Sequence, residues 1–433
     1  MNVVQLHARA PGRGSSVAEG DVIAALDIGS TKISCLIAEV VAPERGELRL
    51  LGLGHQLSRG VRCGSIVNVE DAERAIRLAV DAAERMAGCT ISEVHVNVSG
   101  GRPQSRLYTA SQPTQTSQVS PRDLERIQNS ALGQIDRGAR SILHLSPVQY
   151  HLDDARGIKS PLGMHGADLS IELAAVTIDP AHLRNLSLVI EHAHLNPASF
   201  VLAPYAAAKS VLAEDEFSLG VTVIDMGGAT TSFAIFHEGN LVSSDVIPLG
   251  GQHITNDLAC GLSTNIAHAE RMKTLWGSAL ASDVDESEMI AIPLMGERGT
   301  DAFQKMPKSM LAGIIRPRVE EIFELLRDRL ESCSGAQFTG QRVVLTGGAS
   351  QLTGAREVAV QWLNRQVRLG HPTPIPGMPE SAQNAGFAVS TGLLKYALNP
   401  DPLLFGTRRK IRHAERAEPG YMRKMGRWFA ESF

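Results

Sequence analysis

The 433-residue chain is poor in aromatic residues, which make up only 4% of it, and its five cysteines lie far apart. None of them forms a Cys-x-x-Cys pair or lies in a histidine cluster, which excludes the usual sequence patterns of zinc and redox sites. We expect reduced thiols in a cytosolic protein. No stretch approaches ~18 consecutive apolar residues, so no transmembrane helix is predicted. Residues 1–20 lack the apolar core of a signal peptide and are expected to form a flexible tail.

A large excess of positive charge is also missing. The net charge is −4 and the isoelectric point about 6.4, which argues against nucleic acid as the main partner. Basic residues concentrate near the C-terminus, where residues 407–427 hold eight Lys or Arg and two Glu. This uneven distribution indicates a separate role for that end. The length favours two or more domains, and 43% apolar residues allow a sizeable core.

Two short stretches, "LDIGSTK" and "VIDMGGATT", share one pattern. In each, an apolar strand ends at an Asp, one residue separates the Asp from a Gly, and small residues lead into a second apolar strand. The two aspartates, Asp27 and Asp225, are 198 residues apart, which predicts a duplicated architecture. A third stretch, "VLTGGAS", runs from a late apolar strand into the Gly347-Gly348 turn.

Turns of this composition suit phosphate, because glycines and small side chains let backbone N–H groups approach an anion closely. An Asp beside a polyphosphate would repel it, so an Asp at each turn implies a bound cation. Mg²⁺, held mostly through water, is the natural choice. A single Asp-x-Gly turn is more often only a hairpin. Three such turns in this order favour a nucleotide site, with two turns clamping the phosphates and the third under the adenosine.

These three stretches resemble the phosphate and adenosine motifs of the actin/Hsp70/sugar-kinase superfamily. Four others resemble the FtsA family of bacterial cell division proteins: "ILHLSPVQYHLDDARGIKSPLGMHGADL", "APYAAAKSVLAEDE", "GGQHITNDLA" and "AERMK". The resemblance implies an α/β, actin-like fold, in which two RNase H-like lobes enclose a nucleotide cleft and a small α+β domain is inserted in the first lobe. The implied parts are a first lobe at 21–91, 174–206 and 380–398, an inserted domain at 92–173, a second lobe at 207–250 and 335–379, a helical subdomain at 251–334, a linker at 399–419 and an end helix at 420–433.

The resemblance also implies the ligands, which are ATP and Mg²⁺. Asp27 and Asp225 would orient Mg²⁺ through water. The nucleotide would contact Gly29, Ser30, Thr31, Lys32, Gly227, Gly228, Ala229, Thr230, Thr231, Gly250, Gly251, Glu270, Lys273, Gly347, Gly348 and Ala349. A solvated helical pair is the alternative for Glu270 and Lys273.

Two departures from the family pattern are relevant. Ala229 replaces a third glycine, and Ser232 stands where relatives often have Asp. The segment "FVLAPYAAAK" offers no Glu or Gln to position an attacking water, so we expect ATP binding with at most slow hydrolysis.

The last residues, "GYMRKMGRWFAESF", read as a short amphipathic helix. Its apolar face is Tyr421, Met422, Met425, Trp428, Phe429 and Phe433, and Arg423, Lys424 and Arg427 lie on the flanks and the other face. Aromatic and basic residues in this arrangement suit the headgroup region of an anionic membrane. A helix docked on the protein's own body is the alternative, although the polar linker before it favours detachment.

The family resemblance implies several partners: the C-terminal tail of FtsZ, further copies in a head-to-tail polymer, and later division proteins recruited by the inserted domain. Arg298, Arg316 and Arg318 are candidates for gripping the FtsZ tail, with solvated surface residues as the alternative. The implied location is the cytoplasmic face of the membrane at the division site. Two other functions stay open, a pilus-assembly platform protein and a small-molecule kinase; the end helix and residues 142–169 argue against both.

The periodicity predicts helices over 70–87, 120–132, 180–195, 205–213 and 382–398. Residues 102–120, rich in Ser, Thr and Gln, are predicted to be a loop, and 142–180 to form short strands. Residues 251–330 are expected to be mostly helical. A long helix over 311–332 contains Pro317, which predicts either a kink or a helix that starts there.

Overall fold

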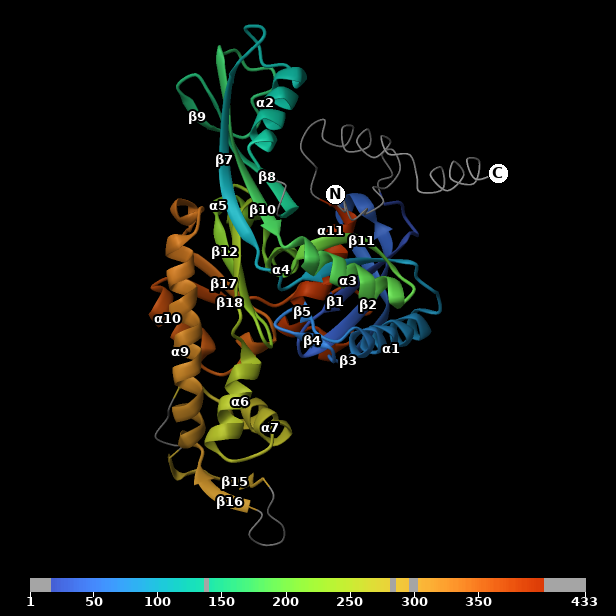
Figure 1. The fold of residues 1–433 in the computed structure, drawn as a ribbon, viewed down its shortest axis with the longest axis vertical. Coiled ribbons are helices and arrows are strands. Elements are labelled where there is room, and N and C mark those ends of the chain that lie inside the picture. The colour runs from blue at the N-terminus through green and yellow to red at the C-terminus, as the bar shows by residue number, and fades with distance from the viewer. Residues whose placement is uncertain (1–16, 136–139, 281–285, 296–302, 401–433) are drawn as a thin grey trace, which may run out of the picture. The chain divides into compact units, whose positions relative to one another are not determined.

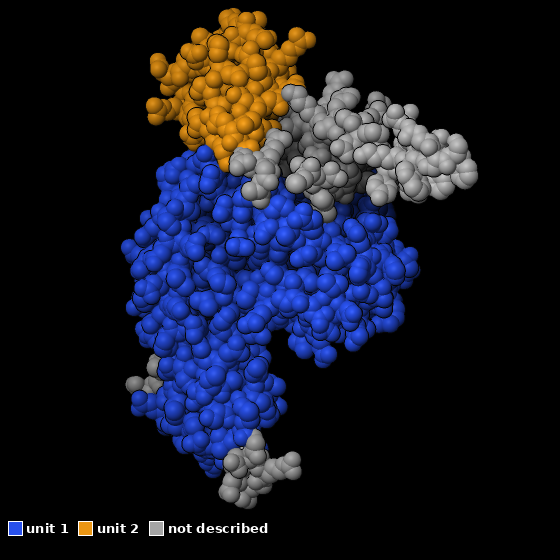
Figure 2. Space-filling view, in the orientation of Figure 1, with its two compact units in different colours: residues 1–107, 137–144, 174–400 blue, residues 108–136, 145–173, 401–433 orange. Residues whose placement is uncertain are grey.

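The computed structural model describes residues 17–135, 140–280, 286–295 and 303–400 (Figure 1). Contacts divide the chain into two compact units, coloured separately in Figure 2. The first takes in residues 1–107, 137–144 and 174–400, and the second 108–136, 145–173 and 401–433. Residues 1–16 of the tail predicted over 1–20, and the whole predicted end helix, lie outside the described residues.

The first unit holds a five-stranded sheet of order β11-β6-β1-β2-β3. Its strands are β1 (Val22–Ile28), β2 (Lys32–Ala42), β3 (Glu47–Leu57), β6 (Glu93–Val98) and β11 (Asn196–Leu202). β1 pairs antiparallel with β2 and parallel with β6. The alternating side chains of β1 divide between two cores, with Leu26 on one face and Ala25 on the other.

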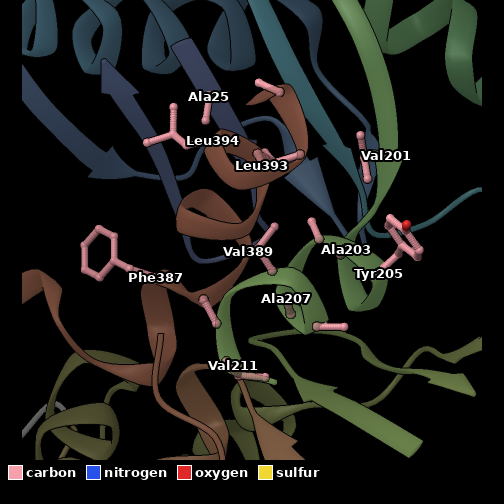
Figure 3. Packing of buried hydrophobic residues seen from close by; sticks show 14 of the residues in the cluster. Ala25, Val201, Ala203, Tyr205, Ala207, Val211, Phe387, Val389, Leu393 and Leu394 are labelled. Atoms are coloured by element: carbon pink, nitrogen blue, oxygen red, sulfur yellow. The ribbon is translucent and has the colours of Figure 1, made fainter. Parts of the chain in front are cut away.

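Helices cover both faces of this sheet. α1 (Val69–Ala87) and α3 (Pro180–His192) pack on the face of Leu26, and α4 (Ala203–Val211) and α11 (Ala388–Leu398) on the face of Ala25. Figure 3 shows buried side chains of α4 and α11, among them Ala207 and Val389, gathered between the two helices. Their apolar cluster also includes strand residues of the second sheet, such as Val223. The two sheets therefore share one continuous core.

The second sheet repeats the arrangement of the first. Its order is β14-β13-β12-β17-β18, built from β12 (Val221–Met226), β13 (Thr231–His237), β14 (Asn240–Ile247), β17 (Arg342–Thr346) and β18 (Gln366–Leu369). As in the first sheet, a central Asp-bearing strand pairs antiparallel with the next strand along the chain and parallel with a later one. The predicted duplication is confirmed.

The region after the second Asp hairpin is helical, as predicted, except for one hairpin. It contains α6 (Gly251–Gly261), α7 (Ile266–Trp276), the strands β15 (Met289–Pro293) and β16 (Phe303–Pro307), and α9 (Ser309–Ser332). Pro317 lies inside α9, so the alternative that a helix starts at this proline is wrong. α10 (Ala355–Leu363) packs against α9.

A four-stranded sheet of order β7-β10-β8-β9 and one helix account for most of the second unit. The strands are β7 (Gln104–Pro113), β8 (Ser141–Leu152), β9 (Ala155–Ile158) and β10 (Asp168–Ile178), of which the outer parts belong to the second unit. α2 (Pro121–Gly133) begins where predicted, because Ser120 and Asp123 form a capping box.

The remaining elements are short: β4 (Val61–Arg62), β5 (Ser65–Ile66), α5 (Glu214–Leu219), and 3₁₀ turns at η1 (Pro43–Arg45), η3 (Ala336–Phe338), η4 (Gly348–Gln351), η5 (Glu380–Ala382) and η6 (Ala385–Phe387). No helix in the described ranges is both long and apolar enough to cross a bilayer.

Several sequence predictions need correction. The strands over 142–180 are not all short, since β8 has 12 residues and β10 has 11. The helix predicted over 382–398 begins only at Ala388, after two 3₁₀ turns. The predicted loop over 102–120 is largely the strand β7, whose polar side chains are mostly exposed or half-buried on a half-exposed sheet. The inserted domain cannot start at residue 92, because β6 is an inner strand of the first sheet, so the insertion begins after Val98.

Candidate functional site

The two Asp-bearing turns have the same construction. Gly29 donates its backbone N–H to the carbonyl oxygen of Lys32 at 3.0 Å, and Gly227 donates to the carbonyl oxygen of Thr230 at 2.9 Å. A Cβ added to Gly29 would lie 2.8 Å from the Lys32 oxygen, and one added to Gly227 would lie 3.0 Å from that of Thr230. A side chain at either glycine would crowd the corresponding carbonyl oxygen of its turn, which favours glycine in both.

The two turns meet each other across the first unit. A Cβ added to Gly228 would lie 2.3 Å from Cγ2 of Thr31, so the second turn touches the first at this glycine. Ala229, by contrast, is 3% exposed, and its methyl group is part of the interior. The replacement of the third glycine by Ala229 is therefore accommodated by burial, while the position that must stay small is Gly228.

Two buried carboxylates and one half-buried ammonium group lie at this meeting point. Burial raises the pKa of Asp27 to about 6, although Lys32 and a hydrogen bond from Ser390 oppose the shift. Burial raises the pKa of Asp225 to about 7, and the charge of Asp27 adds to this shift while Lys32 opposes it. Burial lowers the pKa of Lys32 to about 8 against the attraction of both carboxylates. The three groups thus act on one another, and together they carry more potential negative than positive charge.

This donor set fits a hard divalent cation. Two carboxylates supply oxygen ligands, and a cation would compensate the charge that Lys32 leaves unbalanced. Among the described residues, no three His, Cys, Asp or Glu side chains gather into a metal-ligand group. Water and phosphate oxygens would have to complete the coordination shell, as they do for Mg²⁺ in phosphate sites.

The third turn lies against the second. Gly347 has a φ of +91°, and a Cβ there would lie 2.4 Å from Oδ1 of Asp225. Ala349 faces Gly251, whose added Cβ would lie 2.9 Å from the Ala349 methyl carbon. Gly348 faces Gly386 of η6, 4.0 Å from a Cβ added to Gly348. The third turn and the segments that face it thus carry only small side chains at these positions. A flat ligand could therefore lie close to the backbone here.

Helix α6 supports the second turn from behind. Gly251 and Gln252 donate their backbone N–H groups to the carbonyl oxygens of Gly227 and Gly228, at 3.0 and 2.6 Å. A Cβ at Gly250 would lie 2.5 Å from the Gly227 oxygen. These contacts fix the turn, whereas direct contact of Gly250 and Gly251 with a nucleotide stays a prediction.

The predicted pair Glu270 and Lys273 on α7 is assembled around a threonine. Nζ of Lys273 donates to Oε2 of Glu270 at 2.7 Å, to Oγ1 of Thr255 at 2.8 Å and to the Gly251 carbonyl oxygen at 3.0 Å. Thr255, 1% exposed, also bonds Oε2 of Glu270. The pair therefore lies beside the second and third turns, with Lys273 half-buried and Glu270 exposed. Nucleotide contact by the pair stays a prediction, and the solvated pair stays the alternative for Glu270.

Other predicted residues have defined surroundings. Ser30 accepts a hydrogen bond from the Gly64 N–H at 3.0 Å, and Thr31 is exposed. Thr231 is fully buried and donates its hydroxyl to the Leu249 carbonyl oxygen at 2.8 Å, which gives it a structural bond, whereas Thr230 is half-buried.

Sequence reasoning missed Ser390 and Phe387, on and next to α11. The Ser390 hydroxyl donates to Oδ2 of Asp27 at 3.2 Å, and Nζ of Lys32 lies 3.1 Å from the Phe387 ring centroid. Thr255 lies within the stretch "GGQHITNDLA", which alone does not indicate its bonds to Glu270 and Lys273. Ser390 and Phe387 come from a helix more than 350 residues along the chain from Asp27, and no local pattern indicates such a contact.

Two of the three arginines predicted to bind a partner form ion pairs within the chain. Arg318 pairs with Asp257 at 2.6 Å and with Glu321, and Arg316 pairs with Glu320 at 2.8 Å. Arg298 and the end-helix residues Tyr421–Phe433 lie outside the described residues. Partner and membrane binding by these residues stay predictions.

Comparison with known proteins agrees with this architecture. A family model described as "Cell division protein FtsA" matches residues 222–392, and one described as "SHS2 domain inserted in FTSA" matches 100–177. The chain is 41% identical over 420 residues to the Cell division protein FtsA of Agrobacterium fabrum, covering 95% of each chain. It is 30% identical over 419 residues to that of Escherichia coli K12, covering 95% of this chain and 98% of the relative.

Solved structures show the same fold. MreB5 of Spiroplasma citri bound to ADP matches with a TM-score of 0.53 at 13% identity, over 89% of this chain and 100% of that one. A chain of the PilM-PilN type IV pilus biogenesis complex matches with a TM-score of 0.61 at 16% identity, over 87% and 99%. The duplicated sheets and facing turns thus define an actin-like protein with an inserted SHS2 domain. The sequence relatives identify the family, and the chain belongs to the FtsA family of cell division proteins.

Proposed function

We propose that the chain binds ATP with Mg²⁺ in the cleft between its two Asp-bearing turns, and uses the bound state to control assembly on the membrane. The observation that carries this is the contact of the two turns at Thr31 and Gly228, with Asp27 and Asp225 buried beside it. Mg²⁺, when bound, would neutralise the phosphate charge. Asp27 and Asp225 would hold its water ligands, and the backbone of the turns would face the phosphates.

Hydrolysis is proposed to be slow. Helix α4 is the segment in which relatives place a residue that orients water, and here it reads "APYAAAKSV". Nearly all of its residues are buried in the apolar cluster shared by the two sheets. Without a carboxylate or amide there, a general base for the attacking water is missing from this helix.

The second part of the proposal concerns the membrane. The end helix would place Trp428 and Phe429 in the headgroup region of an anionic bilayer, on the cytoplasmic face at the division site. Each nearby basic residue contributes ~1 kcal/mol to such binding. Ordering a short helix costs on the order of 1 kcal/mol per residue, so one copy binds weakly and reversibly. A polymer of many copies binds far more strongly, through effective concentration.

The third part names the partners. The chain would polymerise head to tail, hold the C-terminal tail of FtsZ on the helical subdomain and recruit later division proteins through the inserted domain. Membership of the FtsA family supports these roles. A small-molecule kinase is less well supported, because the relatives of this chain are cell division proteins and Asp27 and Asp225 are assigned to the water ligands of Mg²⁺ rather than to a base.

Liposome co-sedimentation tests the proposal. The full chain is mixed with phosphatidylglycerol-containing vesicles, with Mg-ATP, with ATP and EDTA, or without nucleotide. We expect the largest pelleted fraction with Mg-ATP. Trp428→Glu should abolish pelleting, while Ala430→Glu, which adds the same charge on the opposite side of the predicted helix, should retain most of it.

Binding of a fluorescent ATP analogue is measured in parallel on the same three proteins and should be equal in all. Absence of Mg-dependent analogue binding by the wild-type chain would contradict the nucleotide part. Equal pelleting of the two Glu variants would contradict the membrane part.

A further inference from the structure

The carboxylate of Asp27 is held from behind by a serine of the last described helix. The Ser390 hydroxyl donates to Oδ2 of Asp27 at 3.2 Å and lies 2.9 Å from the hydroxyl oxygen of Ser34. Ser34 is the antiparallel partner of Asp27 across β1 and β2. Both serines are fully buried, and Asp27 is 7% exposed. The contact is therefore shielded from competing water, which strengthens it.

The pleat of the first sheet explains why these groups meet. Asp27 and Ala25 are two residues apart on β1, so their side chains point to the same face, and Ala25 belongs to the cluster formed with α4 and α11. Ser34 has the same relation to Leu36 on β2. Asp27 and Ser34 thus face α11, the helix that carries Ser390.

Helix α11 is held against α4 by contacts close to Ser390. A Cβ added to Gly392 would lie 1.7 Å from the Ala206 carbonyl oxygen, so α11 and α4 are in backbone contact. The Ser210 hydroxyl of α4 also donates to the Ala388 carbonyl oxygen at 2.7 Å. With its helix held at two points, Ser390 presents its hydroxyl at a fixed place behind Asp27.

The two cleft carboxylates differ in this respect. Asp27 receives a side-chain hydrogen bond on Oδ2, whereas Asp225 receives none from any described residue. A hydroxyl donor stabilises the charged form of a carboxylate and restricts its rotation. Oδ1 of Asp27 accepts no hydrogen bond from a described side chain and stays available as an acceptor for metal-bound water.

We propose that Ser390 is a positioning residue for the cation-bound nucleotide: it holds the Asp27 carboxylate in one orientation, so that Mg²⁺ binds with its water shell already matched. This inference rests on the proposed ATP and Mg²⁺ binding. In this proposal, α11 contributes to the cation site through the Ser390 hydroxyl. Ser34 assists by fixing the direction of the Ser390 hydroxyl.

The test compares Ser390→Ala with Thr391→Val in the full chain. Thr391 is the next residue on α11 and is also fully buried, but its hydroxyl has no hydrogen-bond partner among the described residues. Binding of a fluorescent ATP analogue is titrated with Mg²⁺, and separately measured in EDTA. We expect Ser390→Ala to raise the Mg²⁺ concentration for half-maximal binding about tenfold, the effect of one hydrogen bond to a charged group. Binding in EDTA should not change, and Thr391→Val should match the wild type in both.

Ser34→Ala provides a second test in case Ser390→Ala does not fold. Ser34→Ala leaves the Asp27 bond possible but removes the group that orients it, so it should shift the Mg²⁺ midpoint in the same direction by about twofold to threefold. An unshifted midpoint in Ser390→Ala, or in Ser34→Ala where only that variant folds, would overturn the inference. The inference would also be overturned if Ser390→Ala weakened binding of the ATP analogue equally with Mg²⁺ and in EDTA. Failure of the wild-type chain to bind the analogue would instead overturn the proposed function.

Discussion

At the scale of single residues, buried polar groups carry most of the chemistry of this chain. The two Asp residues each lie opposite a serine in their hairpins, Asp27 opposite Ser34 and Asp225 opposite Ser232. The sequence showed Ser232 only as a departure from the family pattern. The register shows that it is the counterpart of Ser34, so the duplication extends to the residue paired with each carboxylate.

A half-buried histidine in the first sheet gives a prediction about pH. Burial lowers the pKa of His95 on β6 to about 4, from its ordinary value of 6.5. Its Nδ1 atom shares a hydrogen bond of 2.7 Å with the Ser199 hydroxyl, and its ring lies edge-on to Tyr396, 6.4 Å between centroids. The unfolded chain therefore takes up a proton near pH 6.5, while the folded chain resists protonation until about pH 4. Protonation of the unfolded chain therefore lowers the free energy of unfolding as the pH falls from 6.5 toward about 4, whereas above pH 6.5 His95 causes no such loss.

We expect the folded state to lose about 2 kcal/mol through His95 between pH 7 and pH 5. The free energy of unfolding is measured by urea titration at both pH values for the wild type, for His95→Gln and for His165→Gln, which changes an exposed histidine. The loss between pH 7 and 5 should shrink by about this amount in His95→Gln alone. An unchanged loss in His95→Gln would contradict the prediction.

At the scale of elements, the contact of α11 with α4 shows where a helix needs glycine for packing. Gly392 lies inside α11, and an added Cβ would lie 1.7 Å from the Ala206 carbonyl oxygen. Gly313 lies inside α9, and no atom lies within 4 Å of an added Cβ. The two substitutions to alanine should therefore have opposite effects.

Gly392→Ala should destabilise the protein by about 2–3 kcal/mol or more, because the helices would have to separate. Gly313→Ala should stabilise it by about 0.5–1 kcal/mol, through the lower entropy of the unfolded chain. Urea midpoints of the two variants and the wild type check both signs. Equal midpoints for the two variants would show that the α4–α11 contact is loose.

The elements that the sequence predicted correctly are those with a strong local pattern. The Asp hairpins, α1 and the capped start of α2 follow from runs of apolar residues and from turn or capping residues a few positions away. β7 was predicted as a loop because its polar residues hide the alternation of a half-exposed strand. Pro317 did not mark a helix start, because packing of α9 against α6 and α10 outweighs the bond lost at one proline.

At the scale of the whole molecule, the order of the motifs predicted that three turns lie together, but it did not predict which distant residues support them. Motif order placed Asp27, Asp225 and Gly347 around one site, and the contacts between their turns agree with that placement. The supporting residues Ser390, Phe387 and Thr255 depend on how distant helices pack, which no spacing in the sequence records. Ala229 is the position that departs from the family pattern, whereas the position that limits the approach of the two turns is Gly228.

The last prediction therefore concerns the contact between the two Asp-bearing turns. Gly228→Ala would place a methyl carbon 2.3 Å from Cγ2 of Thr31, so the turns would have to move apart. Ala229→Gly instead removes the methyl group of a residue that is only 3% exposed. We expect Gly228→Ala to weaken binding of a fluorescent ATP analogue with Mg²⁺ about tenfold or more, since phosphates held from both sides need both turns in place.

Ala229→Gly should leave that affinity within about twofold and instead lower stability by roughly 1 kcal/mol, through the lost methyl group and the added backbone freedom. Affinity from analogue titration and stability from urea unfolding are measured on both variants. The double variant Gly228→Ala with Thr31→Ser should recover part of the affinity, because it removes Cγ2, the atom that the new methyl group meets. Tighter binding in Ala229→Gly, with no loss in Gly228→Ala, would mean that the third glycine of the family pattern, and not the contact between the turns, limits access to the phosphates.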